Sequence, residues 1–270
     1  MQTAQELATA SYEGTAWRTK VRLWRAALIV ALLLVWQVLS STKGALWFSS
    51  PVAIVARFWE ELLNLNLLID AGITLAESVL GFVIGAALGL GLPFILRLFP
   101  RLAAVLDPYI TAAMGVPKLA MAPLLILWFG IDMTSKVVFV VIVVCFLIFF
   151  NTYAGVRAVD PNLIKVARIF GANQKQISRH IVWPTASPYV FAGMKISLPR
   201  SISAAVVGEF LSPYKGLGSS IDRARSMFDM TGVILGVLVV TILIMLVDVA
   251  LSRVQSRSLA WREEETVIGI

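Results

Sequence analysis

The feature that most limits how this chain can fold is a series of long apolar stretches separated by short charged segments. Hydrophobic residues make up 59% of its 270 residues and charged residues only 14%, a composition far from that of a soluble domain. A helix needs about 20 apolar residues to cross the hydrocarbon core of a bilayer. Six stretches come near that length, although the fourth needs flanking residues: Leu23–Leu39, Leu75–Leu96, Tyr109–Phe129, Val137–Phe150, Tyr189–Leu211 and Met230–Val254. We therefore predict an all-α polytopic membrane protein with six transmembrane helices.

The placement of positive charge predicts how these helices are oriented. An even number of spans puts both termini on the same side of the membrane. Fourteen lysine and arginine residues then lie on the side of the termini, and six lie on the other: Lys43, Arg57, Lys136, Lys215, Arg223 and Arg225. Because cytoplasmic loops carry the excess of positive charge, both termini are predicted to be cytoplasmic. The net charge of +7 therefore indicates topology, and we expect no nucleic-acid partner.

The most polar long segment in the middle of the chain lies between the fourth and fifth spans, at residues 165–184. Asn162 can cap a helix that begins just before it. Apolar residues then follow at the spacing of a short amphipathic helix: Leu163, Val166, Ala167 and Phe170. Gly171 can end this helix in the left-handed conformation, and Pro184 is expected to stop a second short helix. We predict a helical hairpin with a basic face that presses on a partner at the cytoplasmic surface; a solvated cytoplasmic loop is the alternative.

The third span contains two prolines, Pro117 and Pro123, with Lys118 beside the first. A proline breaks the backbone hydrogen-bond ladder, which a membrane tolerates only where neighbours or a cavity satisfy the freed groups. An ionisable residue at such a break is a candidate for lining an aqueous path, and pairing or snorkelling is the alternative. Lys118 is therefore a candidate substrate-path residue.

The fifth span holds two further candidates for the path, Arg200 and Glu209. At about 100° per residue, nine residues place them on opposite faces of a helix, so we expect no simple pair between them. Arg200 follows Pro199, as Lys118 also follows a proline, so each cation lies where the backbone can open. A fixed cation would lower the barrier for an anion. The alternative is structural, with both cations paired to carboxylates such as Glu77 or Glu209.

Three glycines in the second span, Gly81, Gly85 and Gly89, are spaced four residues apart. Small residues at that spacing let helix backbones approach closely, so we predict a packing role for them. Glu77 lies one turn earlier and is expected to reach the outer interface, unless it has a functional role.

The chain lacks the motifs of several other classes of protein. No GxxxxGK[ST] loop occurs, so we expect no ATP bound by this chain itself. One histidine, His180, and one cysteine, Cys145, without clustered carboxylates argue against a metal site or a bound cofactor. No catalytic constellation is evident, so we expect a non-catalytic protein. A secondary transporter driven by an ion gradient remains the alternative, but it predicts ionisable relays and internal repeats, and no repeat is evident.

The hairpin also resembles the EAA loop of ABC-transporter permease subunits, which reads Glu-Ala-Ala, three residues, Gly, nine residues, Ile, any residue, Leu-Pro. Six residues of this chain stand at the matching positions: Lys165, Val166, Ala167, Gly171, Ile181 and Pro184. Lys165, Val166 and Trp183 depart from the consensus, while the spacing is kept. The resemblance implies that these six residues form a loop that couples the protein to an ATPase.

From residue 49 to residue 257 the chain resembles the nitrate/sulfonate/taurine group of these permeases. The stretches that carry the likeness are Ser49–Pro51, PKLAMAPLLILWFG at 117–130, SKVV at 135–138, NTYAGVRAVDP at 151–161 and VVGEFLSPYKGLG at 206–218. The resemblance implies a type I ABC importer permease (MetI-like) fold in a bacterial inner membrane. It implies transport of a small anionic solute, such as nitrate, taurine, an alkanesulfonate or a related organic anion.

The same resemblance implies a set of partners and a division of the chain. The partners are a second permease copy, two cytoplasmic ATPase subunits that use ATP and Mg, and an extracytoplasmic substrate-binding protein. We expect a cytoplasmic segment at residues 1–22, a transmembrane permease domain at 23–257 with its coupling loop at 160–188, and a cytoplasmic tail at 258–270.

Overall fold

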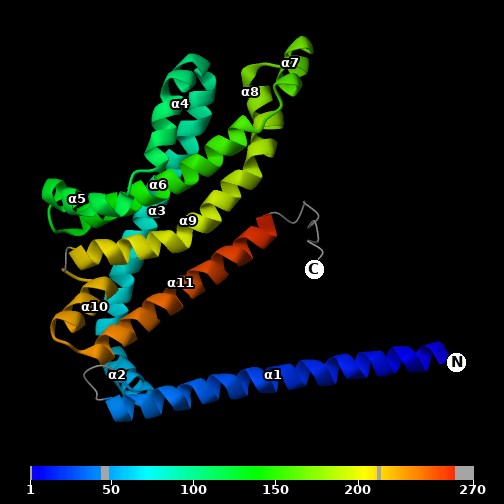
Figure 1. Ribbon diagram of the computed structural model, residues 1–270. Helices are drawn as coiled ribbons and strands as arrows, with labels where there is room; N and C mark the ends of the chain where they lie inside the picture. The colour runs from blue at the N-terminus through cyan, green and yellow to red at the C-terminus, as the bar shows by residue number, and fades with distance from the viewer. Residues whose placement is uncertain (1, 44–48, 212–213, 259–270) are drawn as a thin grey trace.

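The computed structural model describes residues 2–43, 49–211 and 214–258, and every regular element in these ranges is a helix (Figure 1). Five helices are long and apolar enough to cross a membrane, and a bent helix pair provides a sixth crossing if it is counted as one span. The prediction of an all-α polytopic protein is confirmed. The six predicted spans correspond to the five long helices and the bent pair.

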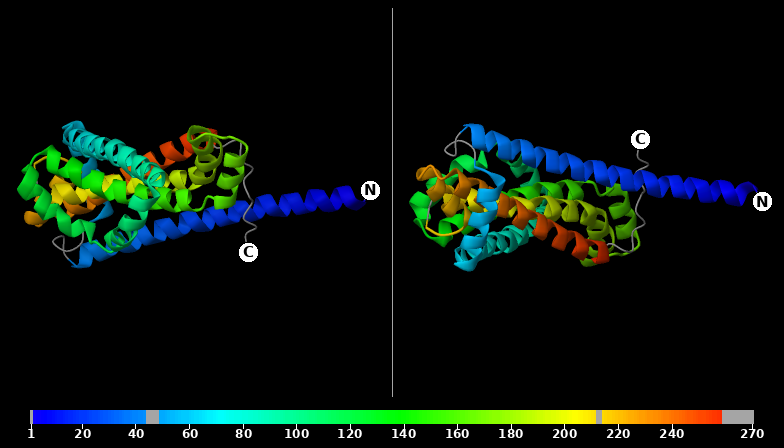
Figure 2. Two further views of the ribbon diagram at one scale, coloured as in Figure 1. Left: turned by 90° about the horizontal axis from the view of Figure 1, so that it is seen from above. Right: turned by 90° about the horizontal axis from the view of Figure 1, so that it is seen from below.

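The first helix, α1 (Gln2–Lys43), runs unbroken through the boundary expected at residue 22. Its apolar span, Lys20–Ser41, is only 6% buried, and it lies at the edge of the helical body, with α2 beside its C-terminal end (Figures 1 and 2). The chain therefore leaves most of this apolar surface to lipid or to another protein.

Helix α2 (Pro51–Leu63) is amphipathic and begins at a well-formed cap. Ser50 Oγ accepts a hydrogen bond from the Ala53 N–H at 3.1 Å, and Pro51 occupies the first turn, where its missing N–H costs nothing. Leu65 then adopts a left-handed conformation (φ +61°) and turns the chain into α3 (Asn66–Leu98).

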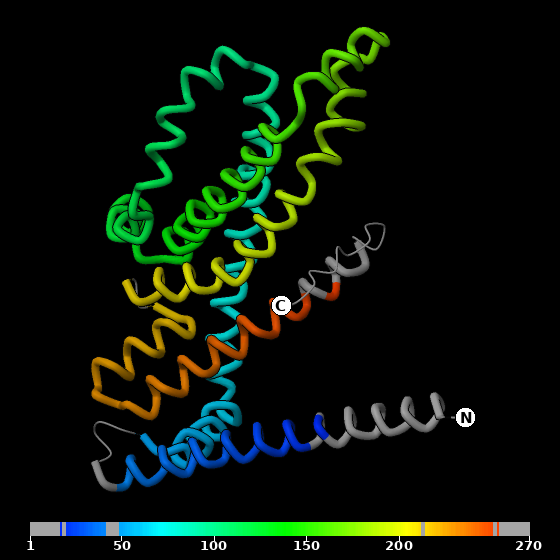
Figure 3. The backbone as a smooth tube through the Cα atoms, turned by 45° about the vertical axis from the view of Figure 1, so that its right-hand side comes forward, coloured from blue at the N-terminus to red at the C-terminus, as the bar shows by residue number. Residues whose placement is uncertain are grey.

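The centre of the fold is formed by α3, α6 (Met133–Arg157) and α9 (Trp183–Leu211), with α3 crossing the other two (Figure 3). The glycines of α3 permit this crossing. A Cβ added at Gly85 would lie 2.8 Å from the Val141 carbonyl oxygen and 2.9 Å from Val144 Cβ. Gly81 and Gly89 meet α6 equally closely, so the predicted packing role of these glycines is confirmed.

The third predicted span is broken in two. Helix α4 (Pro100–Met114) is followed by a 3₁₀ turn (Lys118–Met121) and then by α5 (Ala122–Phe129), with a bend of 89° between the two halves. Pro117 lies at the break, as predicted. Pro123 does not break a helix, because it occupies the first turn of α5, where no backbone donor is needed.

The prediction that Pro184 ends the second helix of the hairpin is wrong. Helix α7 (Pro161–Ile169) is followed by α8 (Gln174–Ile177) and by a π-helical turn (Ser178–Val182) that leads directly into α9. Pro184 lies in the first turn of α9. The wider π turn before it takes up the mismatch that the proline ring creates with the preceding turn, so the helix continues.

The described part of the chain ends with α10 (Leu217–Ser226), a short helix beside α9, and α11 (Met230–Ser258), which packs on α9 and α10. Apart from Ser258, the tail expected at residues 258–270 lies outside the residues that the structure describes. The same holds for the charged run at residues 263–265.

Candidate functional site

The hairpin is defined here as residues 160–184, and its first helix begins at Asp160. The Asp160 carboxylate accepts a hydrogen bond from the Asn162 N–H at 2.8 Å, and Pro161 takes the first helical position. The prediction that Asn162 is the cap is therefore wrong. The residue before a proline favours extended backbone, which is the conformation of an N-cap, so the cap falls at Asp160.

Gly171 ends α7 as predicted. Its φ is +78°, in the left-handed region that glycine adopts without strain. Its N–H donates to the Arg168 carbonyl at 3.0 Å, and the Ala172 N–H donates to the Ala167 carbonyl at 2.9 Å. These two bonds make a Schellman motif, which satisfies the last carbonyls of the helix and reverses the chain.

The second arm of the hairpin is anchored to the bundle. A capping box between Asn173 and Gln176, with bonds of 2.8 and 2.9 Å, starts α8. Arg97, near the end of α3, donates from Nη1 to Ser178 Oγ at 3.2 Å. An apolar cluster beneath the hairpin joins it to α6 and α9: Val156, Val159, Ile177, Val182 and Ala186. A displacement of the hairpin would therefore be transmitted to these two helices.

The outward face of the hairpin is apolar and uncovered. Phe170 is 85% exposed, Ile169 is 81% exposed, and Leu163 and Val166 are about half exposed. Only Ala167 among the predicted apolar positions of α7 packs against the cluster beneath. Neighbouring exposed apolar side chains of this size indicate an interaction surface.

The six residues matched to the family loop pattern all lie in the hairpin. They occupy three kinds of place: exposed on α7 or α9 (Lys165, Val166, Pro184), half-buried against the cluster (Ala167, Ile181) and at the turn (Gly171). Their contact with a partner stays a prediction.

Lys118 lies at the break between α4 and α5. Its ammonium donates to the carbonyl oxygens of Ala113 and Met114, near the end of α4, and of Val116, at 3.3–3.4 Å. It also lies 4.8 Å from the centre of the Phe146 ring on α6. Lys118 thus satisfies carbonyls that the broken helix leaves free, and it brings positive charge to the bend.

Arg200 and Glu209 lie apart, as their spacing predicts: Arg200 is exposed, and Glu209 is fully buried. The alternative in which Lys118 or Arg200 pairs with a buried carboxylate is wrong. The cation bonded to Glu77 is Lys136, at 3.4 Å, and both side chains are at most 2% exposed. Glu77 is buried between helices, and its place near the outer interface stays a prediction. Sequence reasoning assigned Lys136 to a loop because it precedes the most apolar part of α6.

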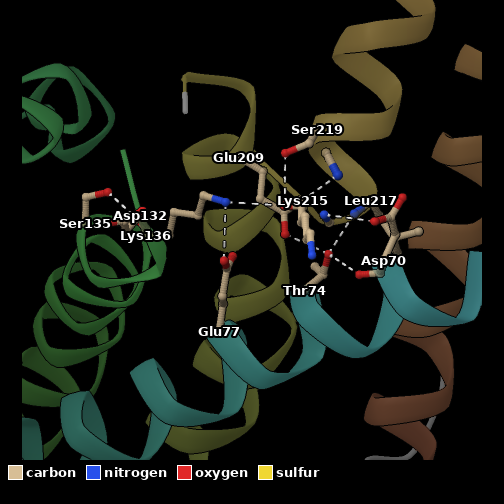
Figure 4. A network of polar contacts seen from close by, with 12 residues as sticks. Asp70, Thr74, Glu77, Asp132, Ser135, Lys136, Glu209, Lys215, Leu217 and Ser219 are labelled. Carbon is tan, nitrogen blue, oxygen red and sulfur yellow. Dashed lines mark hydrogen bonds and ion pairs between the residues drawn. The ribbon is translucent and has the colours of Figure 1, made fainter. Parts of the chain in front are cut away.

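Glu209 belongs to a polar clamp between α3, α9 and the segment before α10, far along α9 from the hairpin (Figures 1 and 4). Its Oε1 accepts from the Thr74 hydroxyl at 2.7 Å, and its Oε2 accepts from the Gly218 N–H at 2.5 Å. Thr74 Oγ1 in turn accepts from the Leu217 N–H at 2.9 Å. At 1.5 Å per residue, the clamp lies about 39 Å along α9 from its first residue.

Asp70 and Lys136 complete the polar clamp. Asp70 accepts from the Gly216 N–H at 3.1 Å and from the Ser220 hydroxyl. Lys136 Nζ donates to the Lys215 carbonyl at 3.3 Å and forms the ion pair with Glu77. Four successive residues before and within α10, 215–218, are thus held by side chains of α3, α6 and α9.

Two glycines allow the backbone to reach the Glu209 carboxylate. Gly216 has φ +110°, and a Cβ there would overlap the carboxylate. A Cβ at Gly218 would lie 2.5 Å from the Val206 carbonyl oxygen and 2.8 Å from Glu209 Oε2. The sequence signal for the polar clamp was therefore present, as a glutamate followed by two glycines after a short loop, but its partners in α3 and α6 were not visible.

Comparisons with known proteins agree with the helical membrane fold described above. A family model described as "Binding-protein-dependent transport system inner membrane component" matches residues 81–259. The chain is 30% identical, over 88% of each chain, to the Bacillus subtilis (strain 168) protein named putative aliphatic sulfonates transport permease protein SsuC. It is 34% identical to the riboflavin transport system permease protein RibX of Chloroflexus aurantiacus, over 74% of this chain and 76% of RibX. The fold is similar to that of a chain in the inward-facing MetNI methionine ABC transporter, with TM-score 0.56, 20% identity and coverage of 74% of this chain and 96% of that one.

Proposed function

Because the chain belongs to the family of binding-protein-dependent transport system inner membrane components, we propose that it is the permease of an ATP-driven ABC importer for a small organic anion. The observation that carries the proposal is the hairpin. It is held by caps and by a buried cluster, yet its tip is apolar and exposed. A transporter driven by an ion gradient is not favoured, because it has no use for such a surface.

The partner of the hairpin is an ATPase subunit at the cytoplasmic face. Covering a large apolar side chain such as Phe170 or Ile169 contributes about 1.5–3 kcal/mol. ATP and Mg are used by that subunit. When the ATPase pair closes, the hairpin moves with it, and the buried cluster transmits the motion to α6 and α9.

The orientation follows from the same contact. The hairpin end of the bundle faces the cytoplasm, which agrees with the excess of lysine and arginine on that side. Both termini then lie in the cytoplasm, and the polar clamp lies at the outer face of the inner membrane. The complete importer contains two ATPase subunits, a second copy of this chain and an extracytoplasmic substrate-binding protein.

The solute is an anion of the sulfonate class. Two cations of the membrane-spanning region, Lys118 and Arg200, have no acidic partner in the part of the chain that the structure describes. The name of the Bacillus subtilis relative, which refers to aliphatic sulfonates, supports this class. The RibX name refers to riboflavin, so a neutral solute is the natural control.

A reconstituted importer tests the proposal. The permease is co-expressed with candidate ATPase and substrate-binding subunits, purified and placed in lipid vesicles. ATP hydrolysis is then measured with taurine, an alkanesulfonate, nitrate or riboflavin. We expect an anion to stimulate hydrolysis and riboflavin to have no effect. Phe170→Asp should abolish co-purification of the ATPase, whereas Asn66→Asp, far from the hairpin, should not. Failure of the ATPase to co-purify with the unaltered chain refutes the proposal.

A further inference from the structure

Two acidic side chains and one basic side chain are buried together in and next to the polar clamp. Glu77, Lys136 and Glu209 come from α3, α6 and α9, and they are 1%, 2% and 0% exposed (Figure 4). If all three were ionised, two carboxylates would share one ammonium group and leave a net negative charge inside a membrane-spanning bundle. An uncompensated buried charge costs several kcal/mol, and a buried acid avoids this cost by taking up a proton.

Hydrogen bonds decide which of the two acids holds that proton. Glu209 accepts on both oxygens, from Thr74 and from the Gly218 N–H. The Leu217 N–H points at Thr74 Oγ1, and the Thr74 hydroxyl lies nearer to Glu209 Oε1, at 2.7 Å, than to the Asp70 carbonyl oxygen, at 3.1 Å, so its hydrogen is directed to Glu209. Because both oxygens of Glu209 accept hydrogen bonds, its ionised form is favoured over the protonated acid.

Glu77 has the opposite surroundings. Its Oε1 is bonded to Lys136, but its Oε2 is buried and has no hydrogen-bond partner in the described part of the chain. A buried carboxylate oxygen without a donor is unfavourable. Protonation of Glu77 removes the negative charge from this unpartnered oxygen.

We propose that Glu77 binds one proton and holds it while the polar clamp is closed, so that Glu77, Lys136 and Glu209 together are electrically neutral. The other charged groups nearby do not compete for this proton. Asp70, two turns earlier on α3, is occupied by Gly216 and Ser220. Asp132 lies at the start of α6, near Lys136 and Ser135 (Figure 4). Lys215 contacts Lys136 through its backbone carbonyl, not through its charged side chain.

The bound proton stabilises the closed arrangement of residues 215–218. When Glu77 loses it, a second negative charge appears beside Glu209. Lys136 is then drawn toward the two carboxylates and away from the Lys215 carbonyl. The polar clamp therefore weakens as the protein loses this proton, and the mobility of residues 215–218 depends on pH.

Two conservative substitutions separate this proposal from an ordinary ion pair. Glu77→Gln mimics the neutral acid: it carries no charge, and its carbonyl oxygen can still face Lys136. Glu209→Gln removes the negative charge and replaces one of the two accepting oxygens with an NH₂ donor, which then faces either Thr74 or the Gly218 N–H, each of which donates to Glu209. The measurements are infrared spectroscopy of the permease in lipid nanodiscs, for the carbonyl stretch of a protonated carboxylic acid, and hydrogen exchange of the Gly218 amide. Neither requires the ATPase, the binding protein or the solute, so the result is independent of the proposed function.

At neutral pH we expect a carboxylic-acid band that Glu77→Gln removes and Glu209→Gln does not. Amide exchange at Gly218 should match the unaltered protein in Glu77→Gln and rise roughly tenfold or more in Glu209→Gln, since a hydrogen bond to a charged group is lost. The proposal is overturned if no band depends on Glu77, or if Glu77→Gln unfolds or exchanges as fast as Glu209→Gln.

Discussion

Gly85→Ala is the sharpest test of how α3 and α6 pack. The added methyl group would lie 2.8 Å from the Val141 carbonyl oxygen and 2.9 Å from Val144 Cβ, and both distances are shorter than van der Waals contact. Neither neighbour is the far end of a flexible side chain. The two helices must therefore separate by several tenths of an ångström, and the contacts along the rest of their crossing weaken with them.

Gly91→Ala, on the same helix, is the matched control. Nothing lies within 4 Å of a Cβ added at Gly91. Both substitutions gain the same helix propensity, about 1 kcal/mol, so the difference between the two variants isolates the packing cost at Gly85. Overpacking of a well-filled core costs about 1–3 kcal/mol. We therefore expect Gly85→Ala to be less stable than Gly91→Ala by about 1–3 kcal/mol, the larger value applying if α6 cannot shift.

Thermal unfolding of the two purified variants in one detergent, with the unaltered protein alongside, measures this difference. Gly91→Ala should unfold at or slightly above the temperature of the unaltered protein, and Gly85→Ala clearly below it. Equal unfolding temperatures for the two alanine variants would falsify the close approach of α3 to α6. A loss of stability in Gly91→Ala but not in Gly85→Ala would mean that α3 packs on α6 through the face that carries Gly91.

Three further predictions concern orientation, the hairpin turn and the path. A cysteine at Gln174 should react with an impermeant thiol reagent from the cytoplasm and one at Ser226 from outside, whereas labelling of both from one side contradicts the orientation. Gly171→Val should lower solute-stimulated ATP hydrolysis several-fold, because a β-branched residue is strained at positive φ. Gly171→Asn should retain most of the activity, because asparagine tolerates that conformation. Equal activity of the two variants would contradict the role of this turn. Lys118→Met and Arg200→Met should lower anion flux. Because Lys118→Met also loses the bonds to the carbonyls at the break, flux is compared at equal amounts of folded protein, and unaltered flux in both variants removes them from the path.

The class of fold and the place of the hairpin follow from the amino-acid sequence alone. Apolar stretches near 20 residues long can be satisfied only by membrane-spanning helices, and local rules of capping and glycine conformation act within a few residues. Gly171 therefore lies where its spacing predicted. The spacing of the three glycines of α3 also predicted their packing role. Small residues four positions apart lie on one face of a helix and allow a neighbouring helix to approach, whichever helix that is.

Predictions of helix ends from single residues were wrong where a nearby residue or turn changes the local hydrogen bonding. Pro184 was expected to end a helix, yet the π turn before it lets the helix continue into α9. Asn162 was expected to be a cap, yet Pro161 moved the cap to Asp160. In both cases the competing feature lies only a few residues away, and a single-residue rule does not weigh it.

Which charged side chains meet depends on the tertiary structure. Glu77, Lys136 and Glu209 are separated by 59 and 73 positions in the chain, and each lies on a different helix. Sequence spacing can show that Arg200 and Glu209 face apart, because one helix has a fixed period. It cannot show which helices cross at a given height in the bundle. That choice depends on how α3, α6 and α9 pack, and the packing alone brings two acids and one lysine together away from water.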